Sequence, residues 1–144
     1  MQKLCLKAIQ SCLIRSAHDC SDGGLAVALA ESCFSGYRHN AIGAKIELSE
    51  HASLCGLANS TALLFAESPS RILLSVKPEN VEKVKELAAQ ANVPCLVIGE
   101  VGGEKLTVTC NGEELIAESV AKLEDFWRNA LPQALDRPMQ MAAD

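Results

Sequence analysis

The stretch 16-SAHDCSDGGLAVALAESC-33 carries the densest chemistry in the chain, because a polar loop runs directly into a helix-forming segment. Its first half holds His18 and Asp19 and ends in two consecutive glycines. Glycine pairs let the backbone turn sharply and let another group approach closely. Its second half is rich in Ala and Leu, with apolar residues at helical spacing. We therefore predict a loop over residues 18–22 followed by a helix.

One interpretation of this loop is an anion site. Gly23 and Gly24 would free backbone N–H groups at a helix N-terminus, where the helix dipole favours phosphate. Asp19 or Asp22 could bind Mg²⁺, a hard cation that prefers carboxylate oxygens. His18 could donate to a phosphate or transfer a proton.

A second interpretation needs no ligand. Ser21 or Asp22 would cap the helix, since both side chains accept hydrogen bonds from first-turn N–H groups. The two glycines would form a tight turn against a sheet, and His18 would make local hydrogen bonds. Residue chemistry leaves both interpretations open.

A second polar cluster, 65-FAESPSR-71, lies between two predicted strands. Arg71 could bind a carboxylate or phosphate through two parallel hydrogen bonds, with Glu67 and Ser68 beside it. The alternative is an ordinary polar turn around Pro69, with a weak Glu67–Arg71 ion pair. Both alternatives stay open here as well.

The rest of the chain alternates helical and strand-like patterns without an internal repeat. Apolar periodicity predicts helices over residues 1–15 and 78–91 and after Ser119, and strands over 41–48, 62–67, 71–76, 95–101 and 105–110. Gly102–Gly103 and Asn111–Gly112 have the composition of tight turns, the first joining two strands as a hairpin. We predict one α+β domain over residues 1–136, with helices against a mixed sheet, and a loose tail over 137–144.

Composition excludes several classes of protein. The net charge is -5, aromatic residues make up 3% of the chain, and Lys and Arg form no cluster, so a nucleic-acid partner is not expected. No apolar run approaches the roughly 20 residues of a membrane span. The N-terminus lacks the continuous apolar core of a signal peptide. We expect a cytoplasmic protein without a membrane partner.

Cysteine, histidine and tryptophan usage is consistent with structural roles. The seven cysteines include no CxxC pair, which argues against a zinc site or a redox dithiol. We predict that most of them are buried, reduced and inert, and no cysteine has an obvious catalytic histidine nearby. His39 and His51 are predicted surface residues, and Trp127 is predicted to anchor the last helix.

Four segments resemble motifs of the phosphoribosylformylglycinamidine synthase family. HDCSDGGLAVALAE resembles the signature HD-x-S-[DE]-GG-L-A-x-A-L-A-E, and LLFAESPSR resembles LFGES-x-SR. VIGEVGG is similar to IG-x-VGG, and FWRNALPQAL is similar to a W-x-x-ALP ending. The four occur in the family's order and cover roughly residues 16–135.

The resemblance implies a C-terminal domain of a two-domain unit. The expected fold is a three-layer α/β/α arrangement with partial likeness to a ferredoxin-like fold, as in aminoimidazole ribonucleotide synthase. In this family ATP and Mg²⁺ are bound mainly by an N-terminal ATP-binding domain. ATP activates an amide oxygen of formylglycinamide ribonucleotide, and ammonia displaces the phosphate to give an amidine. The implied partners are that N-terminal domain, a glutaminase subunit and a small accessory subunit.

The unit occurs twice in such proteins, and this chain resembles the second copy, which frames an auxiliary nucleotide site. Ala66 stands where the motif has Gly, and Pro69 where ligand-binding copies tend to have Gln, so no catalytic residue is expected. The implied phosphate-loop residues are His18, Asp19, Ser21, Asp22, Gly23 and Gly24, with Asp19 as a weak metal ligand. The implied substrate-loop residues are Glu67, Ser68 and Arg71.

The isolated chain is therefore expected to be inactive, to hold no cofactor and to self-associate through an exposed apolar patch. Two alternatives remain at this point. One is the C-terminal domain of another ATP-dependent member of the superfamily, such as aminoimidazole ribonucleotide synthase, selenophosphate synthetase or thiamine-phosphate kinase. The other is a free-standing regulatory or interaction module without catalysis.

Overall fold

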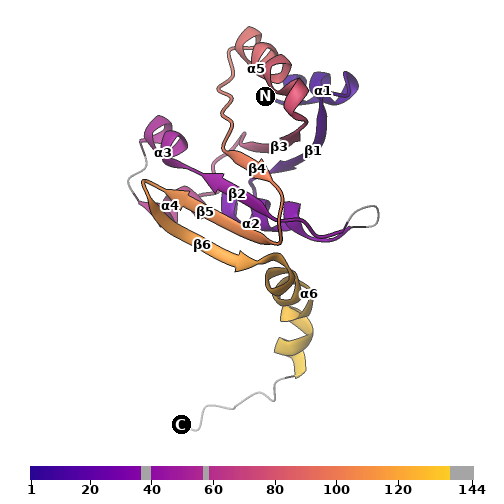
Figure 1. Cartoon of the computed structure of the whole chain (residues 1–144), viewed down its shortest axis with the longest axis vertical. Coiled ribbons are helices and arrows are strands. Elements are labelled where there is room, and N and C mark those ends of the chain that lie inside the picture. Colours follow the sequence, from indigo (N-terminus) through magenta and orange to yellow (C-terminus); the bar gives the residue numbers. More distant parts are fainter. Residues whose placement is uncertain (37–39, 57–58, 137–144) are drawn as a thin grey trace.

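A computed structural model describes residues 1–36, 40–56 and 59–136, and its elements combine helices and strands in the expected α+β class (Figure 1). His39 and the predicted tail over 137–144 lie outside the described residues. In chain order the elements are α1 (Gln2–Gln10), β1 (Ile14–Asp19), α2 (Gly24–Cys33), β2 (Ala44–Glu47), α3 (Ser49–Cys55), α4 (Ser60–Phe65), β3 (Ile72–Val76), the 3₁₀ turn η1 (Pro78–Asn80), α5 (Val81–Gln90), β4 (Gly99–Val101), β5 (Lys105–Cys110), β6 (Glu113–Ser119) and α6 (Val120–Asp136).

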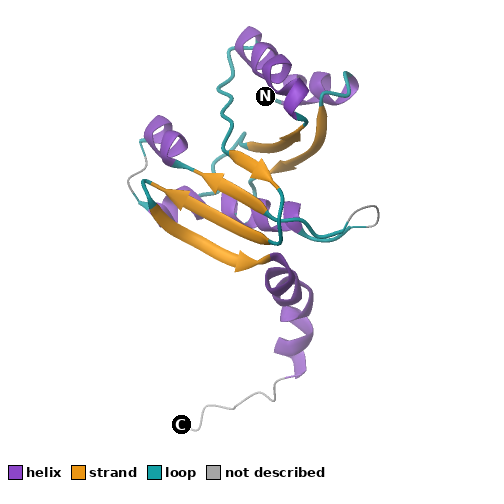
Figure 2. Cartoon of the chain, in the orientation of Figure 1, coloured by secondary structure: helices purple, strands orange, loops and turns teal. Residues whose placement is uncertain are grey.

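The strands form two sheets rather than the single mixed sheet that the sequence predicted (Figure 2). β1 and β3 pair antiparallel, and the other four strands lie in the order β4-β2-β5-β6. β2 runs parallel to β5, and the remaining pairs of this sheet are antiparallel.

The hairpin predicted at Gly102–Gly103 is wrong, because β2 lies between β4 and β5. The segment instead crosses the end of β2. There the Gly43 N–H donates to the Gly103 carbonyl at 2.8 Å, and the Gly102 N–H donates to the Gly43 carbonyl at 2.7 Å. The turn at Asn111–Gly112 does join neighbouring strands, β5 and β6, and both its residues have positive φ.

Two predicted elements have the wrong type or length. The strand expected over 62–67 is helix α4, capped by Asn59, whose Oδ1 accepts from the N–H groups of Thr61 at 2.8 Å and Ala62 at 3.3 Å. The helix expected over 1–15 ends at Gln10, and Cys12 has a φ of 53°. The chain then enters β1, a strand that was not predicted. His18 and Asp19 therefore lie in a strand and not in the loop predicted over 18–22.

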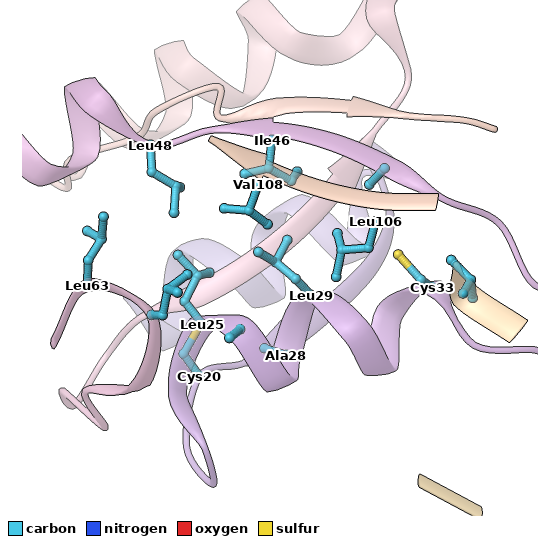
Figure 3. Close-up of a cluster of buried hydrophobic side chains, with 14 of the residues drawn as sticks. Cys20, Leu25, Ala28, Leu29, Cys33, Ile46, Leu48, Leu63, Leu106 and Val108 are labelled. Carbon is cyan, nitrogen blue, oxygen red and sulfur yellow. The ribbon is translucent and has the colours of Figure 1, made fainter. Parts of the chain in front are cut away.

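The main core lies between the four-stranded sheet and helices α2 and α4 (Figure 3). Its members share near-complete burial and come from several elements, among them Leu25, Leu29, Ile46, Leu48, Leu63, Leu106 and Val108. Burying one such side chain contributes about 1.5–3 kcal/mol. This core fixes the N-terminus of α2, where the polar loop of residues 20–22 ends.

Helix α6 leaves the end of β6 and extends away from the sheets (Figure 1). Trp127 attaches it, as predicted, because its ring lies 5.6 Å from the ring of Phe34 and its Nε1–H donates to Glu31 at 3.0 Å. Farther along, Leu131 and Leu135 are exposed. Among the described residues, no helix combines the length and apolar character needed to cross a bilayer.

Candidate functional site

The two polar clusters of the sequence meet at the N-terminus of α2. The Gly23 N–H donates to Glu67 Oε1 at 2.9 Å, across 44 positions of sequence. Next to this contact, the Cys20 N–H donates to the Arg71 carbonyl at 3.1 Å, which extends the β1–β3 pairing. The loop after β1 and the loop after α4 therefore form one junction.

Glycine is required at this junction for two reasons. Gly23 and Gly24 have φ values of +74° and +68°, a region that residues with a Cβ adopt at a cost. A Cβ on Gly24 would also lie 2.8 Å from the Phe65 carbonyl carbon and 2.9 Å from the Ala66 oxygen. The start of α2 thus packs directly on the backbone at the end of α4.

The predicted side-chain cap is wrong. The N-cap of α2 is Gly23, and no side chain caps the helix there. Ser21 and Asp22 are both exposed, and the Ser21 carbonyl accepts from the Gly24 N–H at 3.4 Å. The cause is the left-handed backbone at both glycines, which is not the extended conformation of a capping Ser or Asp.

The Gly23 N–H, which the anion-site interpretation assigns to a phosphate, donates instead to a carboxylate of the chain itself. Glu67 accepts the Gly23 N–H at the positive end of the α2 dipole, where a negative charge is stabilised. The geometry is that of the anion-site interpretation, but the anion is supplied by the protein. The glycine pair acts as the tight turn of the second interpretation.

Arg71 holds the neighbouring loop together without an ion pair to Glu67. Its Nη2 donates to the Ala66 carbonyl, and among the ion pairs of the described residues none joins Arg71 to Glu67. Its Nε is buried, with no hydrogen-bond partner in the part of the chain that the structure describes. Burial raises the pKa of the nearby Cys20 thiol, and the Arg71 charge opposes that rise. Ser68 is exposed on the same loop.

His18 makes local hydrogen bonds, in agreement with the second interpretation. One ring nitrogen lies 2.7 Å from the Asp19 carbonyl oxygen, and the other lies 3.0 Å from Glu31 Oε2. The second oxygen of Glu31 accepts the Trp127 indole N–H. Glu31 therefore links β1 to α6 through α2. The sequence did not predict this role, because no residue near Glu31 along the chain indicates His18 or Trp127 as its partner.

Comparison with known proteins places this arrangement in a family. Residues 1–111 match the family described as "AIR synthase related protein, C-terminal domain". The chain belongs to this family. Phosphoribosylformylglycinamidine synthase subunit PurL of Alkaliphilus metalliredigens is 40% identical over 131 residues, which are 91% of this chain and 16% of that protein. The PurL subunit of Thermosynechococcus vestitus is 43% identical over 141 residues, 94% of this chain and 17% of that protein.

The fold of this AIR synthase related domain also occurs in solved structures. A structure of Thermotoga maritima PurL complexed with ATP aligns with a TM-score of 0.70 at 20% identity. The alignment covers 85% of this chain and 20% of that chain. At this identity the likeness shows the fold alone, and it confirms the α+β class. The chain spans about a sixth of the length of the curated relatives it matches.

The described residues of the domain do not make a magnesium site by themselves. Asp19 is exposed at the end of β1 and pairs with Ile72 through the backbone. No group of three or more His, Cys, Asp or Glu side chains in the described ranges could hold a metal ion.

The cysteines of the domain are free, but fewer are buried than predicted. Cys20 and Cys33 are buried, and burial raises the pKa of both thiols, which makes them less reactive. Cys12 and Cys55 are exposed, and Cys5, Cys95 and Cys110 are partly buried. The prediction of mostly buried cysteines is therefore wrong.

Proposed function

We propose that this chain is the C-terminal domain, residues 1–136, of a phosphoribosylformylglycinamidine synthase subunit that works in the cytoplasm. The complete enzyme would use ATP to activate the amide oxygen of formylglycinamide ribonucleotide, so that ammonia displaces phosphate and leaves an amidine. Four sequence motifs and the relatives named PurL, which match more than nine-tenths of this chain, support the proposal.

The hydrogen bond between the Gly23 N–H and Glu67 Oε1 carries our proposal for the domain's role. A carboxylate of the chain itself accepts the N–H at the N-terminus of α2. This domain would therefore contribute a surface that lines a binding site, here called a wall, and no reacting group. That role suits the second copy of the unit, which frames an auxiliary nucleotide site. His18 and Asp19 at the end of β1, and Ser68 on the loop after α4, would face that site.

ATP and Mg²⁺ would act only in the complete protein, where they would supply the phosphoryl group and its charge neutralisation. An N-terminal ATP-binding domain, a glutaminase subunit and a small accessory subunit would complete the assembly. The chain's own residues would position the wall, and none of them would be catalytic. Activity would therefore depend on how the α2–α4 junction packs against the rest of the enzyme.

A domain replacement tests this proposal. The matching segment of Alkaliphilus metalliredigens PurL is replaced by this chain, and amidine formation is measured with formylglycinamide ribonucleotide, ATP and ammonium. We expect activity from the chimera and none from the 144-residue chain alone. A folded but inactive chimera, or an active isolated chain, would contradict the proposal.

The matched variant of the chimera is Glu67→Gln, which keeps the size of the side chain and removes its charge at α2. A wall role predicts a higher KM for a nucleotide substrate with kcat changed by less than about threefold, because no reacting group is lost. A drop in kcat of a hundredfold or more would show that Glu67 takes part in the chemistry.

The isolated chain exposes apolar residues that the complete protein would cover. Phe126, Leu131 and Leu135 on α6 are between 60% and 76% exposed. Contiguous exposed apolar surface promotes association. We expect sedimentation velocity to show concentration-dependent self-association, and a strictly monomeric chain at high concentration would contradict this expectation.

A further inference from the structure

An exposed thiol and a partly buried imidazole lie together on α3. Cys55 Sγ is 3.7 Å from His51 Nδ1 and 4.0 Å from His51 Nε2, within the range of a weak sulfur hydrogen bond. The i, i+4 spacing on a helix brings the two side chains to one face. The sequence analysis predicted His51 as an isolated surface residue and expected no cysteine with a histidine beside it.

The surroundings of the imidazole favour its neutral form. Burial lowers the pKa of His51, and the positive charge of Arg71 lowers it further. The groups that act on the ring are Cys55 from its own helix and Arg71 from the turn before β3, while Glu50 beside it in sequence is exposed. A neutral ring has a nitrogen free to accept the thiol proton near pH 7.

The thiol has the arrangement of a nucleophile beside a base, because an imidazole nitrogen lies within reach of a weak hydrogen bond to its sulfur. Cys55 is the last residue of α3 and is exposed, so a small reagent can reach the sulfur. Such a pair reacts when the proton moves to nitrogen as sulfur attacks, which is general-base activation of a nucleophile.

We propose that Cys55 is a site of reversible S-thiolation, activated by His51 as general base, whose reaction partner is a low-molecular-weight disulfide. In this step Cys55 Sγ attacks one sulfur of the small disulfide while His51 takes the thiol proton. The disulfide's S–S bond breaks and a mixed disulfide forms on Cys55. The other half leaves as a thiolate, which takes the proton back from the imidazolium and departs as a thiol. One disulfide bond is exchanged for another, so no further oxidant is needed.

Cys12 provides an internal comparison within the same chain. It is also exposed and free, and among the described residues no histidine is hydrogen-bonded to it. Both thiols therefore meet the same reagent, and only Cys55 has the histidine. The buried thiols of Cys20 and Cys33 report at the same time whether the chain is folded.

The experiment uses oxidised glutathione with the 144-residue chain, and peptide mass spectrometry measures mixed-disulfide formation at each cysteine between pH 6 and 9. An unassisted thiol is only a few per cent ionised at pH 7, so we expect Cys55 to react about ten times faster than Cys12 there. The advantage should shrink toward pH 9, where an ordinary exposed thiol ionises without help. Cys20 and Cys33 should stay unmodified.

His51→Gln is the decisive variant and Glu50→Gln is its matched control on the same helix. We expect His51→Gln to bring the Cys55 rate to within about twofold of Cys12, and Glu50→Gln to leave the advantage in place. Equal rates for Cys55 and Cys12 in the unmodified chain, or an unchanged Cys55 rate in His51→Gln, would overturn the proposal. Modification of Cys20 and Cys33 as fast as Cys12 would also overturn it, because the proposal requires α3 to be formed.

Discussion

The two sheets that Figure 2 shows differ sharply in how many buried apolar residues surround them. The four-stranded sheet, with α2 and α4, holds the continuous core that includes Leu106 and Val108. The smaller unit of β1, β3, α1 and α5 contributes only Ala8, Val84 and Ala88 as fully buried apolar residues of its helices. A two-stranded sheet alone is marginally stable in water, so the smaller unit depends on its attachment to the larger one.

The polar loop after β1 is that attachment. Its first residue beyond the strand, Cys20, is buried in the main core, and Gly24 packs on the end of α4. A loop rich in chemical groups is thus placed where the well-packed and thinly packed regions join. The glycine pair therefore serves the packing between the two regions. The polar residues around the pair, such as Ser21 and Asp22, are exposed at this boundary.

The largest expected effect is that of Gly24→Ala. The new Cβ would meet backbone atoms of Phe65 and Ala66, which cannot move without shifting α4, and the residue has a positive φ. We expect a loss of at least about 3 kcal/mol in the free energy of unfolding, measured by urea titration. Gly112→Ala is the control, because Gly112 has a φ of +80° but open space around it. It should cost about 1 kcal/mol, and equal losses in the two variants would contradict the packing argument.

A pair of identical substitutions tests the contrast between the two regions directly. Val108 is 0% exposed in the main core, and Val84 is 5% exposed on α5. We expect Val108→Ala to cost about 2.5 kcal/mol and Val84→Ala about 1 kcal/mol, because the thin region can relax into the space that is left. Amide hydrogen exchange should also show faster opening of β1 than of β5 in the unmodified chain. Equal losses of unfolding free energy in the two variants, together with equal exchange rates in β1 and β5, would contradict the contrast between the two regions.

Sequence patterns predicted the elements with strong periodicity and failed where two patterns overlap. α2, α5 and β5 were expected close to their observed positions. The short apolar run in α4 fits a strand or a helix equally well by periodicity, and the Asn59 cap that decides it was not weighed. β1 was divided between the predicted helix over 1–15 and the predicted loop over 18–22, since its alternation is weak and no residue type indicates the left-handed backbone at Cys12.

The sequence predicted which residues belong to the candidate site but not which of them are in contact. The sequence identified Gly23, Gly24, Glu67 and Arg71 as parts of two separate loops, and the structure joins Gly23 to Glu67. Such a contact depends on tertiary packing of α2 on α4, which spacing along the chain cannot reveal. The same holds for Glu31, whose partners come from β1 and α6.

A double-mutant cycle measures how strongly the hydrogen bond between Trp127 and Glu31 holds α6 against α2. Glu31→Ala removes the acceptor, and Trp127→Phe removes the indole N–H that donates to it at 3.0 Å. We expect each variant to lose about 1 kcal/mol or slightly more, with a coupling energy near 1 kcal/mol, because one hydrogen bond to a charged group is shared. Urea unfolding followed by circular dichroism gives all four values. Strict additivity would mean that this contact does not hold α6.

The smallest effect that we predict is a pH dependence at the start of α6. Glu124 accepts hydrogen bonds from the Ser35 hydroxyl and N–H and from Arg128, and these hold its pKa below the ordinary value of 4.5. A lowered folded-state pKa means that the stabilisation is present above about pH 4.5 and is lost as the pH falls through the folded-state value. We expect the fluorescence of Trp127, the only tryptophan, to show loosening of α6 as the pH falls below the ordinary carboxyl pKa of 4.5.

The control for that acid effect must be local, because the pKa of Glu47 is also lowered, by hydrogen bonds from Ser49 and Thr109, at the end of β2. The pKa of both carboxylates is lowered, so global acid unfolding would mix their contributions. Glu124→Gln should flatten the acid change in Trp127 fluorescence, whereas Glu47→Gln should leave that signal unchanged and alter only the global transition. An acid change that persists in Glu124→Gln would show that α6 responds to the opening of the larger sheet, and the boundary between firmly and loosely held regions would then include α6 as well.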